Sequence, residues 1–94
     1  MGKNNLLNLE QNDLKEFVEM NVFEIMEKLE DDGLMFDVTY EHKGYSYTLN
    51  NSAFQNKLYN IPKKLELKGN RLFLIFNKNT SYLIQPDYLA NFVG

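Results

Sequence analysis

The segment from Asp13 to Asp32 constrains the fold more than any other part of the chain, because it is the longest stretch with a single periodicity. A stripe of mostly apolar residues recurs every three or four positions, which is the spacing of one face of an α-helix. This apolar stripe comprises Leu14, Phe17, Val18, Asn21, Val22, Ile25 and Leu29. Glutamates occupy the other side, and Gly33 supplies a residue that tolerates the left-handed conformation at a helix end. The pattern predicts one long helix whose apolar stripe faces the core.

The start of this helix carries its own signal. Asp13 followed by Glu16 resembles a capping box, and Asn8 or Asn12 provides an N-cap side chain just before it. We therefore expect the helix to begin close to Asp13 and to run without interruption to Asp32. Residues 1–8 are expected to form a flexible tail.

The rest of the chain alternates between apolar and polar residues, as half-buried strands do. Strands are expected at 34–40, 45–49, 64–68, 71–76 and 81–85, and the connections between them are mostly short turns. Short turns favour antiparallel pairing. Residues 53–59 are compatible with helical turns or an irregular crossing, and Pro86 introduces a short closing helix over 87–92. The prediction is an α+β fold, with a long N-terminal amphipathic helix packed on a mainly antiparallel sheet of about five strands.

The length of 94 residues fits a single domain, 1–94. The absence of cysteine excludes disulfides and thiolate chemistry. No apolar run approaches the roughly 20 residues that span a bilayer, so no membrane partner is expected. No signal peptide is recognisable, so we expect a cytoplasmic protein. Thirteen Asn, with nine Lys against one Arg, indicate an AT-rich coding genome, such as that of a low-GC bacterium or its phage.

The net charge of −3 hides a strong polarity along the chain. From Glu10 to Glu41 there are eleven acidic residues against two lysines, whereas from His42 onward seven basic residues face two acidic ones. One interpretation is that the two halves attract each other in the fold. The other is that each half presents its charge to a different partner.

Catalytic chemistry finds little support in the sequence. His42 is the only histidine and lies in a predicted turn, where an orienting partner and a pocket are not expected. Glutamates three residues apart can share a cation, but no calcium-binding loop accompanies them. Phosphate-binding, zinc and dinucleotide motifs are absent. We expect no catalytic residues, no cofactor and no metal site, and therefore not an enzyme.

Two apolar side chains, Met20 and Phe23, fall inside the acidic arc of the predicted helix. They are either covered by another part of the chain or anchor a partner protein within a charged rim. The predicted partner-binding residues are Glu16, Glu19, Met20, Phe23, Glu24, Glu27 and Glu30. An alternative surface combines Lys57, Lys63, Lys64, Lys68, Arg71 and Lys78 with Tyr59, Phe73 and Tyr82, which are ingredients of single-strand nucleic-acid binding.

In size and acidic composition the chain is similar to small phage inhibitors of host machinery, including DNA mimics and anti-CRISPR proteins, although no motif is shared. The order of strands with a closing helix is loosely similar to pleckstrin-type domains, with the long helix leading instead of trailing. The function predicted is non-enzymatic binding of another protein with a basic surface, as an inhibitor or adaptor acting through the acidic helix face. A phage-encoded protein would act in the host cytoplasm. The alternatives are a nucleic-acid-binding module and a homo-oligomeric structural protein.

Overall fold

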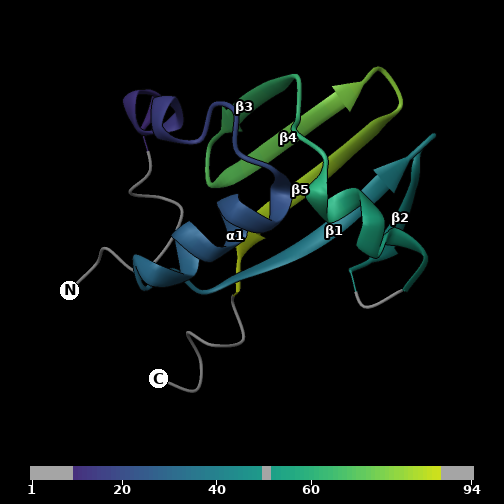
Figure 1. Ribbon diagram of the computed structural model, residues 1–94, viewed down its shortest axis with the longest axis horizontal. Coiled ribbons are helices and arrows are strands. Elements are labelled where there is room, and N and C mark those ends of the chain that lie inside the picture. The colour runs from purple at the N-terminus through teal and green to yellow at the C-terminus, as the bar shows by residue number, and fades with distance from the viewer. Residues whose placement is uncertain (1–9, 50–51, 88–94) are drawn as a thin grey trace.

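The computed structural model describes residues 10–49 and 52–87 (Figure 1). A 3₁₀ helix, η2, leads into the α-helix α1, and a second 3₁₀ helix, η3, separates two β units. The elements are η2 (Gln11–Glu16), α1 (Val22–Asp31), β1 (Phe36–His42), β2 (Tyr45–Thr48), η3 (Ser52–Tyr59), β3 (Lys64–Lys68), β4 (Arg71–Asn77) and β5 (Thr80–Pro86). The predicted tail at 1–8 and closing helix at 87–92 fall on residues 1–9 and 88–94, which are outside the described part apart from Asp87.

The five strands form one antiparallel sheet in the order β2-β1-β5-β4-β3. This confirms the predicted α+β class and the antiparallel pairing. Tight turns connect β1 to β2 and β3 to β4. In the first turn Lys43 and Gly44 have positive φ angles of 52° and 84°, and in the second Gly69 has a φ angle of 63°. The two β units meet along β1 and β5, whose ladder runs from Phe36 opposite Pro86 to His42 opposite Thr80.

The core lies between one face of the sheet and the helical elements, with α1 crossing in front of the strands (Figure 1). Alternation along the strands directs one set of side chains into this layer. The buried hydrophobic residues are Leu14, Phe17, Val22, Ile25, Leu29, Leu34, Tyr40, Leu72, Leu74, Tyr82 and Ile84. The helices therefore cover a single face of the sheet, called here the covered face.

The prediction of one long helix from 13 to 32 is wrong. Helical structure breaks after Glu16, and a turn at 17–19 precedes α1. Glu19 has a φ angle of 73°, which no α-helix accommodates. Asn21 then caps α1, because its Oδ1 accepts the backbone N–H of Glu24 at 2.7 Å, while Oε1 of Glu24 accepts the N–H of Asn21 at 3.0 Å. This reciprocal capping box starts a new helix in the middle of the predicted one.

The break changes which stripe residues reach the core. Leu14, Phe17 and Ile25 are buried as predicted, but Val18 is 60% exposed, which corrects its assignment to the core. The turn at 17–19 rotates Val18 away from the face it would share with Leu14 in a continuous helix. The predicted start is also wrong, since Asp13 closes a capping box with Glu10 and not with Glu16.

The C-terminal end of α1 follows the prediction. Gly33 has a φ angle of 84°, and its N–H donates to the Glu30 carbonyl. The N–H of Leu34 reaches the Leu29 carbonyl, as in a Schellman motif. The first strand begins at Phe36, two residues later than predicted, because Leu34 is used in this helix stop.

Candidate partner-binding surface

The capping box at Asn21 determines which way the side chains of α1 point. Val22, Ile25 and Leu29 are fully buried on the covered face. At 3.6 residues per turn, Phe23 lies about 100° from Val22. Glu27 and Glu30, four and seven residues after Phe23, lie on the same flank of the helix as Phe23. All three residues of this flank are exposed.

Phe23 is held against a residue from a distant part of the sequence. Its ring centroid lies 5.9 Å from that of Tyr59, the last residue of η3, with an angle of 37° between the rings. The N–H of Val22 donates to the carbonyl of Asn60 at 3.2 Å, which fixes the beginning of α1 to the end of η3. Phe23 is nevertheless 40% exposed and Tyr59 63% exposed. The result is an aromatic pair on the surface, held by two elements.

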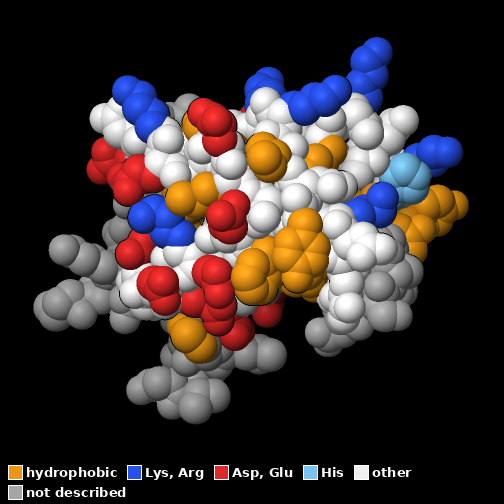
Figure 2. Space-filling model, viewed as in Figure 1, with side chains coloured by type: hydrophobic (Ala, Val, Ile, Leu, Met, Phe, Trp, Pro, Cys, Tyr) orange, Lys and Arg blue, Asp and Glu red, His pale blue; other side chains and the backbone are white. Residues whose placement is uncertain are grey.

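We call Phe23, Tyr59, Glu27 and Glu30 the aromatic–acidic patch. Figure 2 shows a hydrophobic cluster near the centre of the face that α1 occupies, with acidic side chains gathered below and to its left and basic ones mostly along the upper and right margins. The charge polarity of the sequence therefore remains visible on the surface. Lys28 pairs with Glu16 at 3.3 Å within the acidic half, and Lys64 and Lys68 pair with Glu66 within the basic half.

The other predicted site residues do not join this patch. Met20 is half-buried against the core, so it is not an exposed anchor. Glu24 is committed to the capping box with Asn21, and the carboxylate of Glu16 pairs with Lys28. Glu19 lies in the turn before α1, at the rim of a separate cleft. The continuous-helix interpretation grouped these residues on one arc, and the break at 17–20 disperses them.

Tyr59 belongs to this patch, whereas the sequence predicts a base-stacking role for it together with Phe73 and Tyr82. The structure separates the three, because Tyr82 is fully buried and Phe73 lies on the face of the sheet opposite the core, where Lys68 sits 5.3 Å from its ring centroid. These aromatic residues do not form a common stacking platform.

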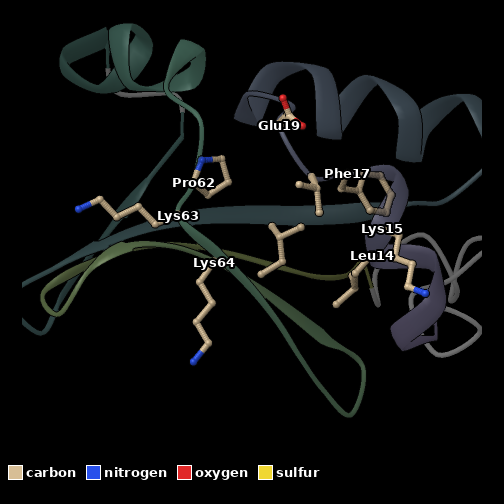
Figure 3. Close-up of a pocket in the computed structure, with 9 residues that line it drawn as sticks. Leu14, Lys15, Phe17, Glu19, Pro62, Lys63 and Lys64 are labelled. Atoms are coloured by element: carbon tan, nitrogen blue, oxygen red, sulfur yellow. The ribbon is translucent and has the colours of Figure 1, made fainter.

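A cleft of about 200 Å³ separates the η2 turn from the start of β3 (Figure 3). It is lined by Leu14, Lys15, Phe17, Val18, Glu19, Pro62, Lys63, Lys64 and Leu65. In Figure 3 the ammonium groups of Lys15, Lys63 and Lys64 point away from the hollow, and so does the carboxylate of Glu19. The floor is therefore apolar, and its charged groups do not converge as they do in sites that orient a substrate.

His42 differs from the solvent-exposed turn residue that was predicted. It ends β1, half-buried, with Nδ1 2.8 Å from the hydroxyl of Thr80 and its ring stacked on that of Tyr40 at a centroid distance of 6.3 Å. Its neighbours thus fix the ring in the sheet. Within residues 10–49 and 52–87, no group of three or more His, Asp or Glu side chains is placed to hold a metal ion.

Two further observations concern the chain as a whole. None of the helices in the described residues has the length and apolar character needed to cross a membrane. Comparison with protein-family models, curated proteins and solved structures gives no significant match.

Proposed function

We propose that the protein is a non-enzymatic binding module that recognises another protein through the aromatic–acidic patch. The observation that carries this proposal is the exposed pair of Phe23 and Tyr59 next to the exposed carboxylates of Glu27 and Glu30. Aromatic residues that are held rigidly on a surface are the commonest energetic anchors of protein interfaces. Charged residues around such an anchor form the rim that orients the partner.

The chemistry of the patch defines the kind of partner. The carboxylates of Glu27 and Glu30 are joined by exposed Asp31 and Asp32 at the end of α1. We infer a partner that places an apolar side chain against the two rings and lysine or arginine side chains beside the helix. Complementary charge of this kind accelerates association and makes it sensitive to salt. An inhibitor or adaptor acting on a basic protein surface fits this description.

The first experiment compares the proteins retained from a lysate of the source organism by the wild type and by two patch variants, Phe23→Ala and Tyr59→Ala, with identification by mass spectrometry. Phe23→Ala removes a ring contact worth about 0.5–1.5 kcal/mol beyond the area that it buries. Because Phe23 is 40% exposed, the total loss should stay below the roughly 3–5 kcal/mol of a fully buried Phe, and the fold should persist. Tyr45→Ala is the matched control for Tyr59→Ala, because Tyr45 is a 69% exposed tyrosine on β2 outside the patch. The expected result is a protein retained by the wild type and by Tyr45→Ala but lost with both patch variants.

The second experiment measures affinity and rate for that purified partner. Phe23→Ala should weaken binding by about 2 kcal/mol or more, which is roughly thirtyfold in Kd. Glu27→Lys combined with Glu30→Lys should slow association and flatten its salt dependence, whereas Glu19→Lys, outside the patch, should have little effect. Equal retention and equal affinity across all variants would exclude the patch as the binding surface.

Nucleic-acid binding is the alternative function, and one observation favours it. Lys63, Lys64 and Lys68 are exposed on β3 or just before it, and Arg71 is exposed at the start of β4. A mobility shift with DNA or RNA that weakens with salt, and that is abolished by Lys64→Glu with Lys68→Glu but not by Phe23→Ala, would favour this function over protein binding.

A further inference from the structure

The sheet has a second face, turned away from α1, which we call the open face. The helical elements contribute their apolar residues to the opposite, covered face. Phe73 and Ile75 of β4 and Leu83 of β5 alternate with buried neighbours and therefore point to the open face. Each of the three is only partly buried. Strands β4 and β5 thus present an apolar strip that none of the described helices covers.

Charged side chains of opposite sign border this strip. On β1, Asp37 and Glu41 share the open face, while on β3 the same face carries Lys64 and Lys68. Glu66 stands between the two lysines, with carboxylate oxygens 2.7 Å from Nζ of Lys64 and 3.6 Å from Nζ of Lys68. The hydrogen bond from Lys64 lowers the pKa of Glu66. One side of the open face is therefore acidic, and the other carries two lysines for one carboxylate.

The strand register places these charges at matching heights. Leu83 pairs with Phe73, and two residues along the strands Ser81 pairs with Ile75. Following the same rows outward, Glu41 is level with Lys64, because Glu41 pairs with Ser81 and Lys64 with Ile75. Asp37 lies four residues before Glu41 on β1, and Lys68 lies four residues after Lys64 on β3, which runs in the opposite direction. Asp37 is therefore level with Lys68. The acidic and basic borders are thus in register across the apolar strip.

We propose that this open face binds a second copy of the chain, with the two sheets packed face to face about a twofold axis parallel to the strands and lying between β4 and β5. Rotation about that axis places β5 over β4 of the other copy and β1 over β3. Leu83 then faces Phe73, while Glu41 faces Lys64 and Asp37 faces Lys68. Because a twofold interface uses each contact twice, every charge pair occurs in duplicate.

Charge selects this arrangement over the other way of stacking two sheets. A twofold axis parallel to the sheets but perpendicular to the strands would instead place β1 of one copy over β1 of the other, with carboxylates facing carboxylates. It would also place β3 over β3, with lysines facing lysines. The rotation of roughly 30° between aligned packed sheets shifts individual contacts but keeps the acidic border over the basic one. The surface is therefore self-complementary in one orientation only.

The size of the face indicates a dimer of modest affinity. In this arrangement four strands of each copy overlap, because β2 extends beyond β3 of the other copy. At a spacing of about 4.8 Å and a rise of about 3.3 Å per residue over seven residues, these four strands give a face of roughly 440 Å² per copy. Two copies bury on the order of 900 Å², which is below the roughly 1,200 Å² of stable specific interfaces and in the range of weak, transient ones. The aromatic–acidic patch lies on the helical side and stays accessible, so the dimer would present two patches facing outward.

The test measures self-association of the full chain by sedimentation equilibrium, from low micromolar to submillimolar concentration. The wild type should show a reversible monomer–dimer equilibrium. One variant, Asp37→Lys with Glu41→Lys, makes both borders of the open face basic apart from Glu66. The other, Lys64→Glu with Lys68→Glu, makes both borders acidic apart from Arg71, which pairs with residue 68 on the same face. Each alone should raise the dimer Kd about tenfold or more, because like charges then oppose each other.

An equimolar mixture of the two variants should restore association, since a basic face then meets an acidic one. Phe23→Ala serves as a control and should dimerise as the wild type does. Circular dichroism would verify that each variant is folded. A wild type that is monomeric over the whole range, reversed variants that dimerise as tightly as the wild type, or a mixture that associates no better than its components would each overturn the proposal.

Discussion

Replacing Asn21 with alanine distinguishes the interrupted helix from a continuous one by the sign of the stability change. In the structure, Asn21 Oδ1 accepts the Glu24 N–H at 2.7 Å and thereby satisfies one of the free donors at the start of α1. Loss of an N-cap side chain typically costs about 1 kcal/mol, within a range of about 0.5–2. Glu24 also loses part of the geometry that lets its carboxylate accept the Asn21 N–H. We therefore expect Asn21→Ala to destabilise the protein by about 1 kcal/mol.

A continuous helix from 13 to 32 would respond in the opposite direction. Position 21 would then be a helix interior, where alanine is better than asparagine by several tenths of a kcal/mol. Urea unfolding followed by circular dichroism gives the free energy directly, and a loss of 1 kcal/mol corresponds to a fall of about 4–8 °C in Tm for a domain of this size. Asn21→Asp is the matched control, because aspartate retains an N-cap acceptor and should stay close to the wild type. An unchanged or increased stability of Asn21→Ala would refute the break.

Further substitutions test the same structure by urea titration. Glu19→Gly should stabilise by roughly 1 kcal/mol because glycine relieves the left-handed backbone; a loss of similar size would indicate a helical residue. Ile25→Ala should cost about 2–5 kcal/mol, and a cost below about 0.5 would remove Ile25 from the core. Val18→Ser should cost less than about 0.5 kcal/mol, and a larger loss would mean that Val18 is buried. Burial raises the pKa of Tyr82 from 10.0 to about 12, so the free energy of unfolding should keep its full value below pH 10 and fall as the pH rises towards 12. The free energy of unfolding of Tyr82→Phe should fall less steeply over this range. An equally steep fall in both proteins would show that Tyr82 does not cause it.

The sheet could be predicted from the sequence because its signals are local. The glycine turns at Gly44 and Gly69 and the alternation in β3 to β5 each reside within a few neighbouring residues. The pairing of β1 with β5 could not be predicted in this way, since β2, η3, β3 and β4 lie between these two strands in the sequence. Local patterns establish that strands exist, and long-range packing decides their order.

The sequence contains a signal for the helix break, but the apolar periodicity of residues 14–29 continues through it and favours a single helix. Asn21 is the polar residue of the stripe, and Glu24 follows three positions later, which is the spacing of a capping box. The candidate site depends on this break, because the true start of α1 sets the direction of Phe23. The contact of Phe23 with Tyr59 required the placement of η3, a segment with weak periodicity whose path no local pattern determines.

The position of β5 in the sheet has a consequence for the order in which the protein is made. β5 is the last described strand to leave the ribosome, yet it occupies the middle of the sheet. Until it emerges, the β1–β2 hairpin and the β3–β4 hairpin have no strand to join them, and apolar residues of both remain exposed to solvent. The five-stranded sheet therefore cannot be completed before β5 emerges, and until then the edges of β1 and β4 that β5 covers are open to association with other chains.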